Sequence, residues 1–243
     1  MGQGPSTSLR ANGVGLGLRG ETHGRDRSHS LSPLRPRLPR HPRRSDSTPR
    51  PGRKASRAAT GGNLQPWHIA IVQGEPMTRL KAIMAEKIAT GVTETPAYDI
   101  YPKELVAPYR DRRYAVGEAM YAHLGIPRDD KTARRDWFAR NFEFFGAPAA
   151  YFCTVDRRMG PPQWSDLGMY LQNLMLLAVE AGLATCPQEC WAMYPETVGT
   201  FLEIREDRML FCGMAIGYED KSARVNALRT ERADEAEWLT TIR

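Results

Sequence analysis

Short apolar runs alternate with amphipathic segments along residues 59–243. Three of the runs predict strands, at 67–72, 149–155 and 209–216. The second and third are apolar at nearly every position, as expected of strands that are buried on both faces of a sheet. Apolar residues at helical spacing predict three amphipathic helices. These predicted helices lie at 77–89, 113–124 and 129–145.

The segment 166–183 is the most hydrophobic helical stretch of the chain. It is apolar almost all round, which is typical of a central core helix or an interface helix. Residues 184–195 contain two prolines and are predicted to form a loop. Strands that alternate with several helices indicate one layered domain, of the α/β or the α+β class, over residues 59–243.

Residues 1–58 differ in composition from the rest of the chain. They hold 13 Lys+Arg against 3 Asp+Glu, whereas residues 59–243 hold 21 against 25. None of the aromatic residues lies in this arm, so it cannot bury enough apolar surface to offset chain entropy. We predict a disordered basic arm rich in Arg, Pro, Ser and Gly. Since the positive charge is confined to the arm, we do not expect the domain to bind nucleic acid.

The absence of three common motifs excludes several frequent classes of catalytic and nucleotide-binding site. The GxSxG, GxxxxGK[ST] and HExxH motifs are absent. Only two histidines lie beyond the arm, neither beside a cluster of ligands, so we expect no metal centre.

No apolar stretch is long enough to span a bilayer, and we expect no membrane association. Four cysteines without a CxxC pair favour free buried thiols and a cytoplasmic protein. They are Cys153, Cys186, Cys190 and Cys212.

The turn before the first predicted strand is the clearest candidate for a ligand site. It reads Thr60-Gly61-Gly62-Asn63-Leu64-Gln65-Pro66-Trp67. Its small residues permit the close approach of a flat ligand, and its two side-chain amides supply both donors and acceptors. A ring with donors and acceptors on its edge would suit this turn. The alternative is a turn that only caps the following strand, with Asn63 bonded to its own backbone.

Four separated segments together resemble the FMN-dependent nitroreductase family. They are the glycine turn with its strand, GMYLQNLMLLAVEAGLATCPQE, FCGMAIGY and the terminal NALRTER, in the family's order over residues 55–243. The stretches 101–131 and 141–152 resemble the branch that acts on nitroaromatic compounds. The resemblance implies an α+β nitroreductase-like fold, with a central mixed β-sheet flanked by helices, and an intertwined homodimer.

The resemblance also implies an activity. Members of the family are FMN-dependent NAD(P)H oxidoreductases that reduce nitroaromatic or quinone-type acceptors in a ping-pong cycle. The flavin carries the redox chemistry while the protein binds and orients it. The choice between NADH and NADPH and the physiological acceptor stay open. One alternative is another reaction of the same fold, such as reductive dehalogenation, enone reduction or flavin cleavage. The other is a non-catalytic protein whose basic arm binds nucleic acid, membrane or an acidic partner.

Positions that match the family imply a set of site residues. Part of the glycine turn would lie along the isoalloxazine and ribityl chain. These cofactor-binding positions are Thr60, Gly61, Gly62, Asn63 and Gln65. Pro187, Gln188 and Glu189 match the loop whose backbone N–H points at flavin N5, and the catalytic role falls to Gln188 and Glu189.

Basic residues complete the expected site. Arg229 and Arg232 match the positions that bind the FMN phosphate, for which a guanidinium fork is well suited. Arg112 and Arg113 are candidates to line the flavin or an anionic substrate such as a nitrobenzoate.

The beginning of the chain departs from the family's pattern. The family opens with a helix bearing an Arg-Arg-Ser cluster, a second helix, and only then the glycine turn. Residues 43–45 spell this cluster, but only 14 residues separate it from Thr60, and Pro49 and Pro51 interrupt any helix. An excess of Arg, Pro, Ser and Gly is what an out-of-frame reading of GC-rich coding sequence produces. We hypothesise that the residues before position 54 are a mistranslated or alternatively started leader.

Overall fold

The computed structural model describes residues 34–35 and 51–243 of the chain. Residues 1–33 and 36–50 lie outside the described part. Most of the predicted basic arm, including the Arg-Arg-Ser cluster at 43–45, is therefore not tested by the structure.

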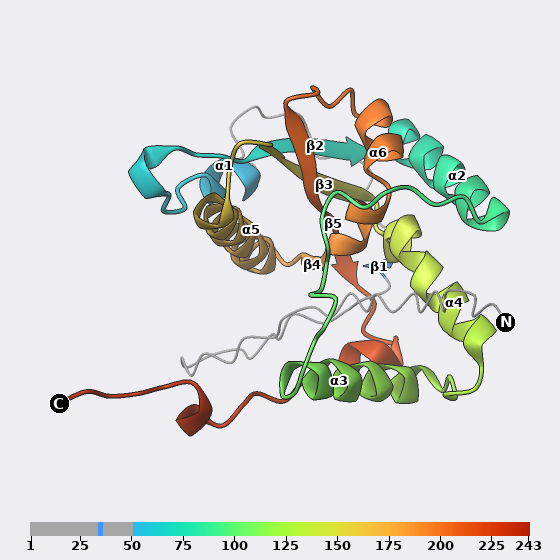
Figure 1. The fold of residues 1–243 in the computed structure, drawn as a ribbon. Helices are drawn as coiled ribbons and strands as arrows, with labels where there is room; N and C mark the ends of the chain where they lie inside the picture. The colour runs from blue at the N-terminus through green and yellow to red at the C-terminus, as the bar shows by residue number, and fades with distance from the viewer. Residues whose placement is uncertain (1–33, 36–50) are drawn as a thin grey trace, which may run out of the picture.

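A five-stranded sheet forms the centre of the molecule (Figure 1). Its strands are β1 Leu34–Arg35, β2 His68–Gln73, β3 Ala149–Asp156, β4 Ala184–Gln188 and β5 Arg208–Glu219. The order is β1-β5-β3-β2, and β4 also pairs with β5. All these pairings are antiparallel, so the mixed sheet that we expected is not found in the described chain. A hydrophobic pattern reveals that strands exist, but it does not encode their relative direction.

Six helices surround the sheet in the described residues. They are α1 Pro51–Ala55, α2 Glu75–Thr90, α3 Tyr109–Leu124, α4 Lys131–Ala139, α5 Pro161–Glu180 and α6 Pro195–Phe201. Five short 3₁₀ segments accompany them. They are η1 Gly61–Asn63, η2 Arg140–Gly146, η3 Glu189–Met193, η4 Arg224–Ala227 and η5 Glu235–Glu237. The three predicted strands and the helices predicted at 77–89, 113–124 and 166–183 are confirmed, with shifted ends.

Apolar side chains fill both faces of the sheet. Successive side chains of a strand point to opposite faces, and in β3 Phe152 joins one apolar cluster while Tyr151 and Cys153 join the other. The first cluster lies under α2, η2 and α6, and the second lies under α1 and α5 (Figure 1). This two-sided burial explains why the predicted strands at 149–155 and 209–216 are apolar at nearly every position.

The folded domain begins before residue 59. Ala55 is fully buried and Ala58 is 8% exposed, both in the cluster under α5. The hydroxyl of Tyr170 on α5 donates a hydrogen bond of 3.2 Å to the carbonyl oxygen of Gly52. Residues 51–58, which we assigned to the arm, therefore pack on the domain. Small residues carry little hydrophobic signal, so their burial depends on the shape of α5.

Residues 129–145 form two elements instead of the single predicted helix. The chain leaves α4 at Ala139 and continues as η2. Phe144 and Phe145 both adopt left-handed backbone, with φ of 53° and 51°, a conformation that is rare for bulky residues. Both rings are buried in the cluster under α2. Their burial therefore outweighs the local preference for a continuous helix.

Residues 184–195 are also more regular than the predicted loop. They form β4, then η3, and then begin α6. Pro187 lies within β4, where it is tolerated because β4 pairs only with β5 among the described strands. Pro195 is the first residue of α6, where its missing N–H costs no helical hydrogen bond.

Candidate active site

The glycine turn is a strained loop that is exposed on the surface. Gly62, Asn63 and Gln65 have φ of 58°, 59° and 49°, in the left-handed region that most residues avoid. All residues from Gly61 to Gln65 are exposed. The carboxamide of Gln65 donates to the main-chain oxygen of Asn63 at 3.3 Å and to its Oδ1 at 3.2 Å. The two amides that we predicted as ligand groups thus lie side by side at the surface.

Asp166, in the first half of α5, fixes this turn from below. Its Oδ2 accepts a hydrogen bond from Thr60 Oγ1 at 3.0 Å, and its carboxylate also accepts from the main-chain N–H of Gly61 at 3.3 Å. Thr60 Oγ1 in turn accepts from the main-chain N–H of Gln65 at 3.1 Å. The Thr60 hydroxyl is therefore used within the turn as both donor and acceptor. The Thr60 side chain therefore braces the loop.

Sequence reasoning missed Asp166. The residue is only 4% exposed, and a buried carboxylate is costly unless hydrogen bonds compensate it. The available signal was an acidic residue at the start of an otherwise apolar helix. That signal does not reveal the partner, because Thr60 lies 106 positions away in the chain.

The second predicted segment, Pro187 to Glu189, lies where β4 ends and η3 begins. The Gln188 side chain is fully buried, and its carboxamide donates to the main-chain oxygen of Asn141 at 2.8 Å. The Glu189 side chain is exposed. The structure thus directs Gln188 inward and Glu189 outward. Because the whole of Gln188 is buried, Glu189 is the position of this pair that is open to a ligand.

Arg113 stacks on one partly buried tyrosine. It lies over the Tyr101 ring, with 3.7 Å between the guanidinium carbon and the ring centroid. Burial raises the pKa of Tyr101, Arg113 opposes this rise, and the charge of Glu189 adds to it. Arg113 and Glu189, both proposed from the sequence, therefore act on the same tyrosine electrostatically. Arg112 instead pairs with Glu237 of the C-terminal segment.

Arg229 and Arg232 are exposed on the C-terminal segment. Arg229 Nη1 donates to the carbonyl oxygen of Asn226 at 2.9 Å, and Arg232 Nη1 donates to Thr230 Oγ1 at 2.8 Å. These bonds stay within the segment, whereas the bonds of the glycine turn run to α5. In Figure 1 the turn lies at the upper left beside α5, and the C-terminal segment leaves the body below α5, past one end of α3. One chain does not bring these two predicted parts of the site together.

The exposed groups fit the chemistry of a flavin nucleotide. A Cβ added at Gly61 would meet no atom within 4 Å, so the turn leaves open space over its main chain. The amides of Asn63 and Gln65 match the donors and acceptors on the edge of an isoalloxazine ring. The guanidinium groups of Arg229 and Arg232 match a phosphate dianion. By contrast, the described residues hold no group of three or more His, Cys, Asp or Glu that could hold a metal ion.

Comparison with known proteins agrees with this α+β fold. The model of the nitroreductase family matches residues 53–218. The 4-nitrobenzoate reductase of Pseudomonas putida is 36% identical over 175 residues, which are 72% of this chain and 76% of that protein. The chain belongs to the nitroreductase family.

Two solved structures show the same fold. The FMN and NADPH-dependent nitroreductase NfnB from Sphigopyxis sp. strain HMH is 45% identical, with a TM-score of 0.79 over 86% of this chain and 94% of that chain. The FMN-dependent nitroreductase NfnB from Mycobacterium smegmatis, in complex with NADPH, is 31% identical, with a TM-score of 0.74 over 78% of this chain and 84% of that chain. The expected nitroreductase-like fold is confirmed.

Proposed function

We propose that this protein is an FMN-dependent NAD(P)H oxidoreductase that reduces nitroaromatic compounds. The observation that carries the proposal is the exposed, braced glycine turn in a chain that is 45% identical to an FMN and NADPH-dependent nitroreductase. The similarity to a 4-nitrobenzoate reductase supports a nitroaromatic acceptor. FMN bound at this site would supply the hydride-transfer chemistry that links the nicotinamide to the acceptor.

Different segments of this chain would bind different parts of FMN. Gly61, Gly62, Asn63 and Gln65 present main-chain and amide groups to the flavin ring. Arg229 and Arg232 bind its phosphate through charge-assisted hydrogen bonds. The main chain from Pro187 to Glu189 faces the reactive part of the ring. These assignments are supported by the exposure of the turn, of Glu189 and of both arginines.

Arg113 is the better candidate of the two for an anionic substrate. It is half-buried and stacked on Tyr101, so its orientation is restricted, and a cation beside an aromatic ring suits a flat anion. The Arg112 guanidinium already pairs with Glu237. We therefore assign the substrate-facing role to Arg113 alone.

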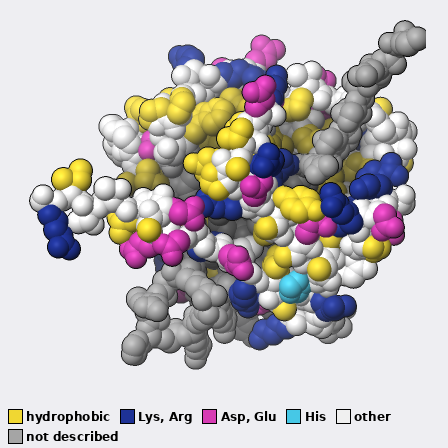
Figure 2. Space-filling model, turned by 60° about the horizontal axis from the view of Figure 1, so that its bottom comes forward, with side chains coloured by type: hydrophobic (Ala, Val, Ile, Leu, Met, Phe, Trp, Pro, Cys, Tyr) yellow, Lys and Arg dark blue, Asp and Glu magenta, His cyan; other side chains and the backbone are white. Residues whose placement is uncertain are grey.

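The proposed active form is a homodimer. Met169 and Leu176 on α5 are 41% and 52% exposed, and Trp238 and Ile242 on the C-terminal segment are 67% and 93% exposed. Figure 2 shows this segment projecting from the body of the molecule. Exposed apolar groups of this size favour contact with another protein surface. A second copy would also supply the glycine turn that lies far from Arg229 within one chain.

The cytoplasm is the proposed location. All four cysteines are buried free thiols, as predicted, and such thiols are typical of reducing compartments. In the described residues, the structure contains no helix that is both long and apolar enough to cross a membrane.

The experiment that tests this proposal pairs flavin retention with activity. The purified protein is incubated with FMN and passed through gel filtration, and its visible spectrum and eluted mass are recorded. We expect flavin peaks on a dimer, and NADPH oxidation that depends on added 4-nitrobenzoate or nitrobenzene. A colourless protein that does not retain added FMN would contradict the proposal.

Two glycine variants provide the matched control. Gly62 and Gly125 have similar φ, 58° and 69°, so Gly62→Ala and Gly125→Ala carry a similar backbone strain of about 1 kcal/mol. Only Gly62 lies in the proposed flavin turn. We expect Gly62→Ala to weaken FMN binding and Gly125→Ala to retain it.

A further inference from the structure

A buried chain of hydrogen bonds holds the end of β4 from inside the core. Gln188 Nε2 donates to the main-chain oxygen of Asn141 at 2.8 Å and to Asn141 Oδ1 at 3.2 Å. Gln188 Oε1 accepts a hydrogen bond from Trp191 Nε1 at 3.3 Å. Gln188 and Trp191 are fully buried, and Asn141 is 4% exposed. Such groups keep their bonds, because a buried donor or acceptor left unpaired is costly.

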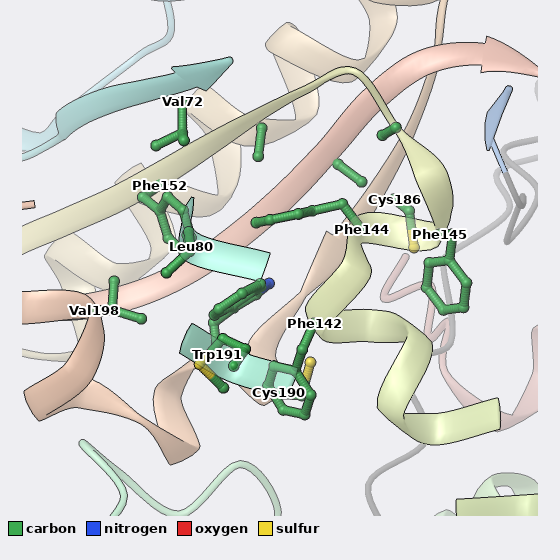
Figure 3. Packing of buried hydrophobic residues seen from close by; sticks show 14 of the residues in the cluster. Val72, Leu80, Phe142, Phe144, Phe145, Phe152, Cys186, Cys190, Trp191 and Val198 are labelled. Carbon is green, nitrogen blue, oxygen red and sulfur yellow. The ribbon is translucent and has the colours of Figure 1, made fainter. Parts of the chain in front are cut away.

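Trp191 has very little freedom to move. Its ring stacks on Phe144, with 4.7 Å between ring centroids, and meets Phe142 and Phe152 edge-on at 5.2 and 5.1 Å (Figure 3). On its remaining side lies Gly213 of β5, where an added Cβ would come within 2.4 Å of Trp191 Cδ1. The position of the indole N–H is therefore set by the packing of four neighbours.

The left-handed backbone of η2 belongs to the same arrangement. The positive φ at Phe144 brings its ring onto Trp191, and the same short segment carries Asn141. Strained backbone persists where surrounding packing over-determines it, and it is found at sites that must hold a fixed geometry. A strained segment thus carries both the ring that fixes Trp191 and the amide that fixes Gln188.

The carboxamide of Gln188 acts on its own main chain. Side chains alternate across a strand, so the Gln188 side chain enters the core on the same side as Cys186. Glu189, the next residue, is exposed. Gln188 also pairs with Gly213 across the sheet. The peptide groups of Gln188 are therefore held from the sheet and from the core, and the chain becomes exposed at the next residue, Glu189.

We propose that Asn141 and Trp191 are positioning residues for the hydride-transfer site, because they lock the Gln188 carboxamide and so fix the main-chain N–H groups at the β4–η3 junction. The inference rests on the proposed function, in which this junction faces FMN. Donors fixed where negative charge develops stabilise the reduced ring without having to reorganise. Loss of such an indirect contact is expected to alter the rate of flavin reduction and the affinity for reduced FMN. It should alter the affinity for oxidised FMN less.

The test compares two tryptophan variants as FMN-loaded proteins. Trp191→Phe removes the N–H donor but keeps an aromatic ring beside Phe144. Trp137→Phe is the matched control, because Trp137 packs in the same apolar cluster, at 5.6 Å from Phe145. We expect Trp191→Phe to slow flavin reduction by NADPH about tenfold to a hundredfold, since small displacements of reacting groups have effects of this size. We expect Trp137→Phe to leave this rate unchanged.

A second readout is independent of turnover. The dissociation constants of oxidised and reduced FMN are measured for each variant, and their ratio gives the preference for the reduced form. We expect this preference to fall in Trp191→Phe and in Gln188→Met, which keeps the side-chain length but removes the amide. Asn141→Ser keeps the main-chain acceptor at this position but deletes two side-chain bonds, the 3.2 Å bond from Gln188 Nε2 and the 2.9 Å bond to the Phe138 carbonyl oxygen. We expect the preference for reduced FMN to fall in this variant too.

The outcomes separate this inference from the proposed function. If the unmodified protein binds FMN and Trp191→Phe matches Trp137→Phe in rate and in affinity ratio, the buried chain has only a structural role and the inference is wrong. If the unmodified protein does not bind FMN, both the proposed function and the inference fail.

Discussion

At the scale of single residues, the site depends on one buried carboxylate. Asp166 accepts hydrogen bonds from the Thr60 hydroxyl and from the Gly61 N–H. It thereby holds a loop in which three of the four residues 62–65 have positive φ. Such backbone costs about 1–3 kcal/mol at each non-glycine position. The carboxylate offsets part of this cost, since a hydrogen bond to a charged group contributes about 1.5–3 kcal/mol.

Replacing Asp166 with Asn tests this role. Both groups of the turn donate to Oδ2, and an amide oxygen can accept both bonds but carries no negative charge. We expect Asp166→Asn to weaken FMN binding about tenfold, because hydrogen bonds to a neutral acceptor are weaker than those to a carboxylate. The measurement is a fluorescence titration of the apoprotein with FMN.

Asp136→Asn on α4 is the control, since Asp136 is exposed and lies far from the turn in the chain. Equal FMN affinity in both variants would show that the brace at Asp166 does not shape the binding loop.

The same residues show how far sequence reasoning reached at this scale. Glycines and amides in a turn carry their own chemistry, so Gly61, Asn63 and Gln65 were predicted as a unit, and the structure finds them exposed together. Asp166 and Asn141 have no such local pattern. Their importance depends on partners 106 and 47 positions away, and only folding reveals these partners.

At the scale of elements, α6 depends on a residue outside itself for its N-terminal cap. Tyr194, at the N-cap position, makes no side-chain capping bond. The carboxylate of Glu94, from the connection between α2 and α3, accepts from the N–H of Glu196 at 2.7 Å and from the hydroxyl and N–H of Thr197. Lys87 Nζ pairs with the same carboxylate at 2.7 Å. One side chain therefore joins α2, the connecting segment and α6.

This cap makes a definite contribution to the pH dependence of stability. Burial by itself raises the pKa of Glu94, but hydrogen bonds from Lys87, Thr197 and Glu196 outweigh it and hold the pKa below the ordinary value of 4.5. A depressed pKa in the folded state stabilises the protein above the pKa of the unfolded state. The stabilisation is lost as the pH falls from 4.5 through the lower pKa of the folded state.

We expect Glu94→Gln to lower the free energy of unfolding at neutral pH by about 1.5–3 kcal/mol, the contribution of hydrogen bonds to a charged group. The loss of stability on acidification should also become shallower. Urea unfolding between about pH 7 and pH 3 measures both effects.

Glu86→Gln is the matched control, since Glu86 is exposed on α2. A Glu94→Gln protein with the pH profile and stability of the Glu86→Gln protein would contradict this account of the cap.

Elements with strong periodicity were predicted well, and elements that owe their form to packing were not. The helix α5 and the strands β3 and β5 are long and apolar, so their own sequences specify them. The strand β4 contains Pro187, and the segment η2 has two phenylalanines in left-handed backbone. Both contradict local backbone preferences. Pairing with β5 stabilises β4, and the stacking of Phe144 on Trp191 stabilises η2.

At the scale of the whole molecule, the predicted site is divided between distant parts of one chain. The glycine turn is bonded to α5, and Arg229 is bonded within its own C-terminal segment (Figure 1). In a two-fold symmetric dimer, the turn of one subunit can meet the arginines of the other, and each dimer then holds two identical sites.

Mixing two variants tests this division, at an FMN concentration at which the unmodified protein binds FMN and neither variant alone does. Gly62→Ala damages the turn, and Arg229→Ala damages the phosphate contact. In a mixed dimer with shared sites, one site carries both defects and the other carries none. After unfolding and refolding an equal mixture, about a quarter of the unmodified FMN binding should return, as random pairing in a symmetric dimer dictates. No recovery on mixing would mean that each chain builds its site alone.

The amino-acid sequence alone was enough to predict an acidic, aromatic-bearing domain, its principal strands and helices, and the chemical character of its glycine turn. These features follow from local periodicity and from residue types whose chemistry does not depend on neighbours, whereas the family was predicted from the resemblance of four separated segments. The antiparallel sheet, the packing of residues 51–58, the brace from Asp166 and the inward direction of Gln188 became visible only in the folded chain. These features depend on contacts between segments far apart in the chain, and close packing in the core selects one arrangement of them.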